Sequence, residues 1–160
     1  MQTTVEKDPA TRSMTVTVEL DVPVERAWQL WADPRQLERW WGPPGAPAKV
    51  LEHELSPGGR MHYAMVTPDG EHHGIWEVLT VDAPTGLTVV DHFADDTGTP
   101  IAEMPASEMT IELLAGDGGT TMRVRSVYAS LEAMEQVIAM GIEEGMRAAI
   151  GQIADVLAAA

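Results

Sequence analysis

The segment from Leu131 to Leu157, LEAMEQVIAMGIEEGMRAAIGQIADVL, contains no proline and repeats apolar residues every three or four positions. This spacing is typical of an amphipathic helix with one apolar face. Ser130 stands just before the segment and is a good N-cap residue. We therefore predict one long C-terminal helix, roughly 40 Å in length at about 1.5 Å per residue.

The chain before this helix is patterned as short strands. Residues 13–20 alternate apolar and polar side chains, which is the pattern of a half-buried strand. Turn residues separate further strand-like runs over residues 48–55, 59–67, 72–81, 87–93, 108–114 and 121–128. Connections this short favour antiparallel neighbours, because parallel strands need a crossover of about a dozen residues or more. Apolar residues at helical spacing predict two short helices, residues 24–31 and 35–40, after the first strand.

These elements predict an α+β fold. A curved seven-stranded antiparallel sheet would wrap around the long C-terminal helix, with the two short helices after the first strand. Such a sheet need not close fully against one helix, and the gap between them would be a cavity. Residues 1–12 are expected to form a flexible N-terminal tail, and residues 13–160 a single domain, which suits the length of 160 residues.

The composition limits the classes of function. The chain has 25 acidic and 10 basic residues, a net charge of −15. This charge argues against nucleic acids and anionic membranes as partners, because their phosphates are neutralised by clustered Lys and Arg. The absence of cysteine excludes disulfides, thiolate metal sites and cysteine nucleophiles. No apolar run approaches the ~20 residues of a membrane span, and residues 1–12 lack a secretory signal, so we expect a cytoplasmic protein.

A series of motifs resembles a known family. The motifs are Trp28-Gln29-Leu30-Trp31-Ala32-Asp33-Pro34, Leu37-Glu38-Arg39-Trp40-Trp41-Gly42-Pro43, Leu55-Ser56-Pro57-Gly58-Gly59-Arg60, Gly74-Ile75-Trp76, Ala83-Pro84 and Met140-Gly141-Ile142-Glu143-Glu144-Gly145-Met146. Over roughly residues 13–158, this series resembles proteins similar to the activator of heat-shock-protein-90 ATPase, which belong to the START-like, or Bet-v-type, helix-grip superfamily (SRPBCC).

The resemblance implies a helix-grip fold with an interior cavity for an apolar or amphipathic small molecule. It does not imply one reaction. Members of the superfamily include lipid carriers, hormone receptors, polyketide cyclases, drug-sequestering resistance proteins and the co-chaperone domain that gives the family its name. The function must therefore be argued from the residues of the cavity.

Strand alternation and helix spacing select the side chains that would face this cavity. Met122, Val124 and Ser126, for example, alternate with arginines that should face solvent. The full set of predicted ligand-binding residues is Trp41, Met61, Tyr63, Met65, Trp76, Val89, Phe93, Met109, Ile111, Met122, Val124, Ser126, Met134, Ile138, Gly141, Ile142 and Gly145. Tyr63 and Ser126 would be the polar groups that orient a ligand.

Several of these residues also have a purely structural interpretation. Methionines fill cores as well as adaptable pockets. Trp40 and Trp41 cannot both point inward from one helix end, and the sequence does not decide which of them faces the cavity. Gly141 and Gly145 each cost about 1 kcal/mol in a helix interior. This cost fits either a close approach of the helix to the sheet or space left for a ligand.

One carboxylate falls on the apolar side of a predicted strand. Asp91 shares the parity of Val89 and Phe93, so it lies either at the strand end in water or in contact with a ligand. The parity of the preceding strand is ambiguous, because Trp76 and Leu79 cannot share a face without a bulge.

The sequence predicts no metal site and no cofactor. His72 and His73 are adjacent on a predicted strand, so they point to opposite faces and cannot chelate one ion. An enzyme would need a titratable group with a perturbed pKa inside the cavity. The candidates for such a group are Asp91, His62, His92, Glu77 and Arg60, and none has a partner at a recognisable spacing.

Three functions remain. The first is a binding module that holds a small hydrophobic or aromatic molecule for sequestration or transport, without catalysis. The second is an enzyme of cyclase or hydrolase type that acts in the same cavity. The third is a co-chaperone-like protein-interaction domain, which we expect to be the less suitable role because the additional N-terminal domain of the family's namesake is not expected here. The expected partner is a small hydrophobic ligand, with no nucleic acid and no membrane, and a homodimer is compatible with the sequence.

Overall fold

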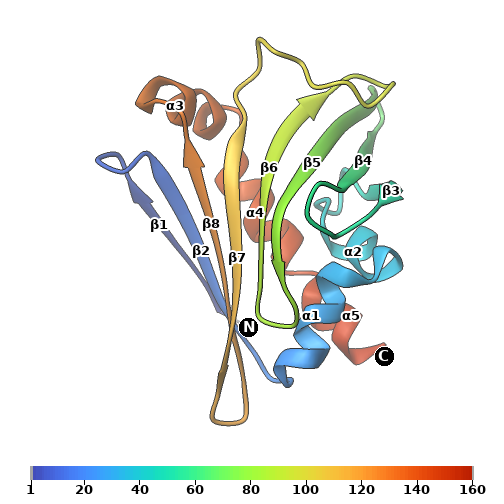
Figure 1. The fold of residues 1–160 in the computed structure, drawn as a ribbon, viewed down its shortest axis with the longest axis vertical. Helices are drawn as coiled ribbons and strands as arrows, with labels where there is room; N and C mark the ends of the chain where they lie inside the picture. Colours follow the sequence, from blue (N-terminus) through green and yellow to red (C-terminus); the bar gives the residue numbers. More distant parts are fainter. Residues whose placement is uncertain (1, 160) are drawn as a thin grey trace.

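One antiparallel sheet of eight strands bends around the C-terminal helices (Figure 1). The computed structural model describes residues 2–159. In chain order the elements are β1 (Thr3–Asp8), β2 (Ser13–Leu20), α1 (Val24–Ala32), α2 (Pro34–Trp40), β3 (Ala48–His53), β4 (Arg60–Thr67), β5 (Gly70–Asp82), β6 (Gly86–Ala94), β7 (Ser107–Gly116), β8 (Gly119–Tyr128), α3 (Leu131–Ala139), α4 (Ile142–Ile150) and α5 (Ile153–Ala158). The strand order is β1-β2-β8-β7-β6-β5-β4-β3. The predicted α+β helix-grip class is confirmed.

Different helices cover the two ends of the sheet. Figure 1 shows α4 behind the sheet, α3 at the upper end, and α1, α2 and α5 together at the lower end. The helix α1 contacts β7 and β8, while α2 contacts β3 and α5. The lower end is therefore covered by three helices, and the upper end by α3 and α4.

The first strand lies where the sequence predicted a flexible tail. β1 pairs with β2 along its whole length, so the prediction for residues 1–12 is wrong over residues 3–8, and the sheet has eight strands rather than seven. The ion pair between Lys7 Nζ and Glu143 Oε1, at 2.6 Å, joins this strand to α4. The strand has no alternating pattern, because Val5 is its one apolar residue, and the pattern alone could not reveal it.

The C-terminal segment forms three helices rather than one. Gly141 has a left-handed backbone (φ 89°, ψ 26°) that separates α3 from α4, and a turn at residues 151–152 separates α4 from α5. The predicted continuous helix over residues 131–157 is therefore wrong in length, although its N-cap is confirmed. The Ser130 hydroxyl accepts a hydrogen bond from the backbone N–H of Ala133 at 3.0 Å. The apolar spacing continues across the breaks, which conceals them in the sequence.

Asp33 and Pro34 separate the two short helices. Asp33 has extended backbone, as expected before proline, and its side chain accepts a hydrogen bond from the Arg35 N–H at 3.0 Å. Both helices bury tryptophan: Trp31 on α1 and Trp40 on α2 are fully buried. Their rings pack edge to face with centroids 4.8 Å apart. The first two tryptophan motifs therefore build the core at the lower end of the sheet.

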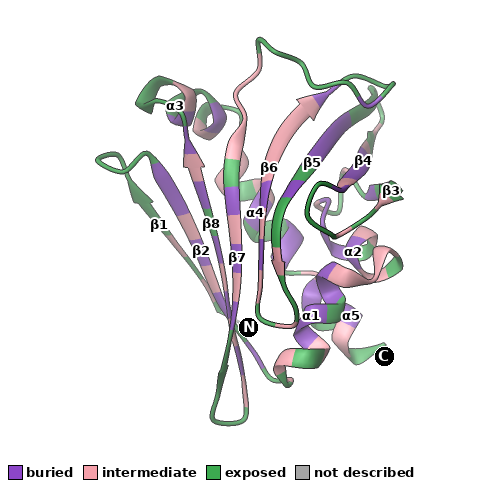
Figure 2. Cartoon of the chain, in the orientation of Figure 1, coloured by how far each residue is buried: buried purple, intermediate pink, exposed green. Residues whose placement is uncertain are grey.

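Burial alternates along β2 and β8, as a sheet with one covered face requires (Figure 2). On β5, Trp76 and Val78 are buried while Leu79 is 44% exposed. The register between β5 and β6 shifts after Val78, so a bulge resolves the ambiguous parity of this strand. Among residues 2–159, no helix is long and apolar enough to cross a membrane.

Candidate functional site

A cavity of about 330 Å³ lies between the sheet and the helices α3 and α4. Just over half of the predicted lining residues surround it. These are Trp41, Tyr63, Met65, Phe93, Met109, Ser126, Gly141, Ile142 and Gly145. The volume falls within the range of small-molecule pockets, about 300–1,000 Å³.

The other predicted residues do not reach the cavity. Met61, Trp76, Val89, Ile111, Met122 and Val124 are fully buried in the main core. Met134 belongs to a separate small cluster with Tyr128 and Val137, against which Ile138 packs. Their assignment to the wall is therefore corrected. The strand residues face the correct side of the sheet, but they lie nearer the end that α1 and α2 cover.

Sequence reasoning missed a further group of wall residues. They are Met14, Pro43, His72, His73, His92, Pro105, Ser107, Tyr128, Val137, Met140 and Met146. Asp91 is also in the wall and is half-buried there, while its contact with a ligand stays a prediction. Parity could have found Tyr128, which shares the face of Ser126 on β8, and Met14, which shares the face of Val16 on β2. The loop residues carry no periodic signal.

The two tryptophans at the end of α2 have different environments. Trp41 lines the cavity, and its indole N–H has no hydrogen-bond partner. Trp40 is fully buried and donates its indole N–H to the Leu30 carbonyl at 2.9 Å. The ring centroids of Trp41 and Tyr63 are 6.0 Å apart in an edge-to-face arrangement. One tryptophan therefore stabilises the core, and the other forms part of the cavity.

The glycines of α4 also differ. An added Cβ at Gly145 would meet nothing within 4 Å, so its missing side chain leaves open space. Gly141 provides the left-handed residue that α4 needs at its start. An added Cβ at Gly141 would meet only the Glu144 carboxylate, at 3.8 Å, so neither glycine serves a close approach to the sheet.

Strand register gathers polar groups on the cavity wall. Asp91 on β6 is opposite Ser107 on β7, which is opposite Tyr128 on β8. Tyr63 on β4 donates its hydroxyl hydrogen to Asp91 Oδ1 at 3.2 Å. Ser126, two residues before Tyr128, lines the same wall. A largely apolar cavity thus contains one polar cluster that could orient a ligand.

Asp91 is half-buried in the cavity wall. Burial raises the pKa of Asp91 to about 7, against the opposite effects of the Tyr63 hydroxyl and the nearby Trp76 indole. The Trp76 N–H does not itself meet the geometry of a hydrogen bond. Burial and the charge of Asp91 raise the pKa of Tyr63 well above its ordinary value and that of Tyr128 to about 12. Both phenols are therefore neutral near pH 7, where the Asp91 carboxyl titrates.

The other candidate titratable groups do not pair with Asp91. The His62 and His73 rings share a hydrogen bond, Nε2 to Nδ1, at 2.8 Å. Burial, together with the neighbouring His73 and Arg60, lowers the pKa of His62. His92 pairs with the exposed Glu77. No acid–base pair with Asp91 is formed by these groups in the described part of the chain.

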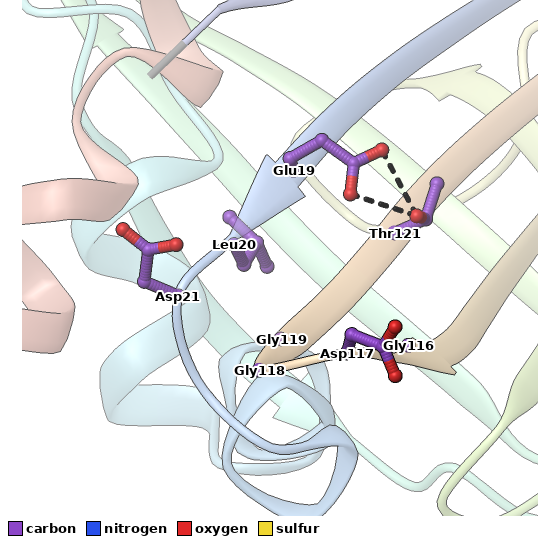
Figure 3. A pocket seen from close by; sticks show the side chains of 8 residues that line it. All are labelled: Glu19, Leu20, Asp21, Gly116, Asp117, Gly118, Gly119 and Thr121. Carbon is purple, nitrogen blue, oxygen red and sulfur yellow. Dashed lines mark hydrogen bonds between the residues drawn. The ribbon is translucent and has the colours of Figure 1, made fainter.

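A second, smaller hollow of about 120 Å³ lies beside the hairpin between β7 and β8 (Figure 3). The Glu19 carboxylate in it accepts hydrogen bonds from the Thr121 hydroxyl at 2.9 and 2.8 Å, so this acidic group is already satisfied. Within residues 2–159, no three acidic or histidine side chains are placed to hold a metal ion. The larger cavity is therefore the candidate site.

Comparison with known proteins identifies the family. The profile described as "Activator of Hsp90 ATPase homolog 1-like protein" matches residues 21–158. The chain belongs to this family. A search of curated proteins finds no match.

Solved structures of similar proteins share this fold. The crystal structure of protein Ms6760 from Mycobacterium smegmatis is 45% identical, over 95% of this chain and 94% of that one, with a TM-score of 0.88. The solution structure of a protein from Arthrobacter aurescens is 42% identical, over 98% and 92%, with a TM-score of 0.92. A protein from Staphylococcus epidermidis is 28% identical, over 96% and 93%, with a TM-score of 0.83.

The motifs that resembled the Hsp90-activator-like family contribute directly to the cavity. Trp41, Gly141 and Gly145 line it. Gly74 is not in the wall, but it leaves room for the ring of Tyr63, because an added Cβ at Gly74 would overlap that ring. The ring therefore lies over the backbone of β5, and this position lets the hydroxyl of Tyr63 reach Asp91 on the next strand.

We expect Gly74→Ala to destabilise the protein by about 1–3 kcal/mol, because the new methyl group must displace a buried ring. Urea unfolding at pH 7 measures the change. Gly116→Ala is the matched control, since an added Cβ at Gly116 meets nothing within 4 Å. Equal stability of the two variants would show that the position of Tyr63 does not depend on Gly74.

Proposed function

We propose that the protein binds a small, largely apolar molecule in the cavity between the sheet and α4. The observation that supports this function is the cavity itself, whose volume is about 330 Å³ and whose wall is mainly methionine, aromatic and aliphatic side chains around one polar cluster. Apolar walls contribute affinity through desolvation, and a few polar groups fix the orientation of the ligand.

The composition of the wall favours an adaptable site. Met65, Met109, Met140 and Met146 come from two strands, the end of α3 and α4. Methionine side chains are flexible and polarizable, so they adjust to ligands of different outline. The rings of Trp41 and Tyr63, which are also in the wall, pack edge to face and provide a more rigid surface. This combination suits sequestration or transport of a small hydrophobic molecule.

Filling the cavity from the helix tests this function. In Gly145→Leu, the new side chain enters the open space, and we expect the affinity for the neutral fluorescent probe N-phenyl-1-naphthylamine to fall at least about tenfold, since the side chain and the probe compete for one volume. Fluorescence titration measures binding, and circular dichroism with thermal unfolding checks the fold. Gly145→Ala, a smaller addition, serves if the leucine variant does not fold.

Ala148→Leu is the control, because Ala148 lies on the same helix with its side chain exposed. It should bind the probe as the wild type does. The proposed function is contradicted if the wild type shows no saturable fluorescence increase, or if both Gly145 variants bind as tightly as the wild type.

Catalysis in the same cavity is the second candidate, and Asp91 is the observation that favours it. A carboxyl with a pKa of about 7 can exchange a proton near neutral pH, as a general acid or base must. Incubation with a panel of cyclase and hydrolase substrates, with Asp91→Asn as the comparison, tests this candidate. The co-chaperone-like role, the cytoplasmic location and the homodimer stay predictions from the sequence.

A further inference from the structure

The charge of the cavity wall is one-sided. Among the wall residues that the structure describes, Asp91 is the one carboxylate, and there is no lysine or arginine. An ionised carboxylate in an apolar setting is unfavourable unless a positive group or several hydrogen-bond donors accompany it. No lysine or arginine in the described wall supplies that positive group.

The hydrogen bonding of Asp91 is also incomplete. In the described structure, its one side-chain partner is the Tyr63 hydroxyl, which reaches Oδ1. The indole N–H of Trp76 is close enough to lower the pKa of Asp91 but makes no hydrogen bond. Among residues 2–159, no donor reaches Oδ2, and a ligand in the cavity can provide one.

An aromatic cluster lies next to this carboxylate, because Tyr63 belongs to the cluster and hydrogen-bonds Asp91. The centroids of Trp41 and Trp76 are 5.0 Å apart, and those of Tyr63 and Trp76 are 6.4 Å apart. Trp41 and Tyr63 are in the cavity wall, as is Tyr128. Cations are attracted to the faces of aromatic rings, most strongly where water is excluded. The same region thus presents a carboxylate and aromatic rings, both of which attract a cation.

We propose that the ligand is a small amphipathic molecule that carries a protonated amine, and that this amine pairs with Asp91 while the apolar part contacts the methionine wall. The proposal rests on the proposed binding function and specifies its ligand class. The net charge of −15 acts in the same direction, because it raises the local concentration of cations and lowers that of anions.

The dependence on pH follows from the groups around Asp91. The titratable groups that face it are Tyr63 from β4 and Tyr128 from β8, both neutral near pH 7, while Trp76 and Ser107 do not titrate. Alkylamines stay protonated below about pH 9, as lysine does. Amine affinity should therefore increase as Asp91 ionises between pH 6 and pH 8.

Two probes of equal size separate charge from shape. 2-Phenylethylamine and 2-phenylethanol are titrated at pH 8 into ¹⁵N-labelled protein, with the amide resonance of Gly145 as the reporter. We expect the amine to bind about tenfold more tightly than the alcohol, the effect of one partly desolvated ion pair with aromatic contacts. At pH 6 the amine-to-alcohol ratio should fall by roughly a factor of ten, since most of the Asp91 carboxyl is then protonated.

Asp91→Asn should reduce the amine-to-alcohol ratio to about 1 at both pH values. Glu108→Gln removes the same charge from an exposed position on β7 and should keep the ratio of the wild type. Because Glu108→Gln changes the net charge by the same amount as Asp91→Asn, it separates the effect of net charge from that of Asp91. Asp91→Asn keeps the histidines of the wall, so any pH dependence that they cause should remain in this variant.

The possible results separate binding in the cavity from recognition of an amine. If both probes bind with equal affinity to the wild type, the cavity binds ligands but the amine proposal is overturned. The same conclusion follows if Asp91→Asn keeps the preference. If neither probe perturbs the Gly145 resonance, the binding function fails together with the proposal.

Discussion

Asp91→Asn is expected to gain stability relative to the wild type as the pH rises from 5 to about 7, and the difference should level off above that pH. Burial raises the pKa of Asp91 from its ordinary value of 3.8 to about 7. Between these two values the folded protein holds a proton that the unfolded chain has released. Stability is therefore greatest below the unfolded pKa and decreases as the pH rises through the folded pKa.

The size of the effect follows from the width of this window. Each pH unit within it costs about 1.36 kcal/mol, so the wild type should lose roughly 2–3 kcal/mol relative to Asp91→Asn between pH 5 and pH 8. The asparagine cannot ionise, and its amide oxygen can still accept the hydrogen bond from Tyr63. Urea unfolding of both proteins at pH 5, 6, 7 and 8 measures the difference, in which the titration of all other groups cancels.

A difference in stability that stays constant over these four pH values would contradict the buried position of the carboxyl. Glu108→Gln again serves as the control, because an exposed carboxylate should give no such trend. The measurement is made without ligand, so it tests the environment of Asp91 independently of any binding experiment.

The two tryptophans at the end of α2 should respond oppositely to replacement by phenylalanine. Trp40→Phe is expected to destabilise the protein by about 2–4 kcal/mol. It leaves the buried Leu30 carbonyl without its donor and opens a void in a filled core. The affinity for the fluorescent probe should not change, because Trp40 is not in the cavity wall.

Trp41→Phe should destabilise the protein less, by about 1–2 kcal/mol in total, because the indole N–H of Trp41 has no hydrogen-bond partner to lose. It should nevertheless alter probe affinity, since the ring forms part of the wall. Urea unfolding measures the stability of both variants, and titration with the fluorescent probe measures their affinity. Equal losses of stability, or a change of affinity confined to Trp40→Phe, would reverse the roles assigned to the two side chains.

The sequence predicted β2 and β8 well because their apolar residues alternate over at least three repeats. The failure at residues 3–8 has a simple cause: an edge strand that contacts one neighbour and carries charged residues needs little apolar surface. The break at Gly141 was missed for a different reason. A left-handed glycine interrupts the backbone but leaves the apolar spacing intact, so only the backbone angles reveal it.

The candidate site was only partly predictable. Alternation identifies the covered face of each strand, but it does not say where along the strand a helix packs. Val124 and Ser126 share a face of β8, yet the first is in the filled core and the second in the cavity. The cluster of Asp91 with Ser107 and Tyr128 depends on strand register, which a single sequence does not contain.

The division of the sheet into a filled end and a hollow end has a consequence for the diversification of such proteins. Side chains next to empty space can be exchanged for larger ones at little cost, whereas exchanges in a close-packed interior strain their neighbours. New specificities can therefore arise from a few replacements around Met65, Met109 and Gly145, while the tryptophan-rich end preserves the architecture. One fold can in this way bind chemically unrelated ligands.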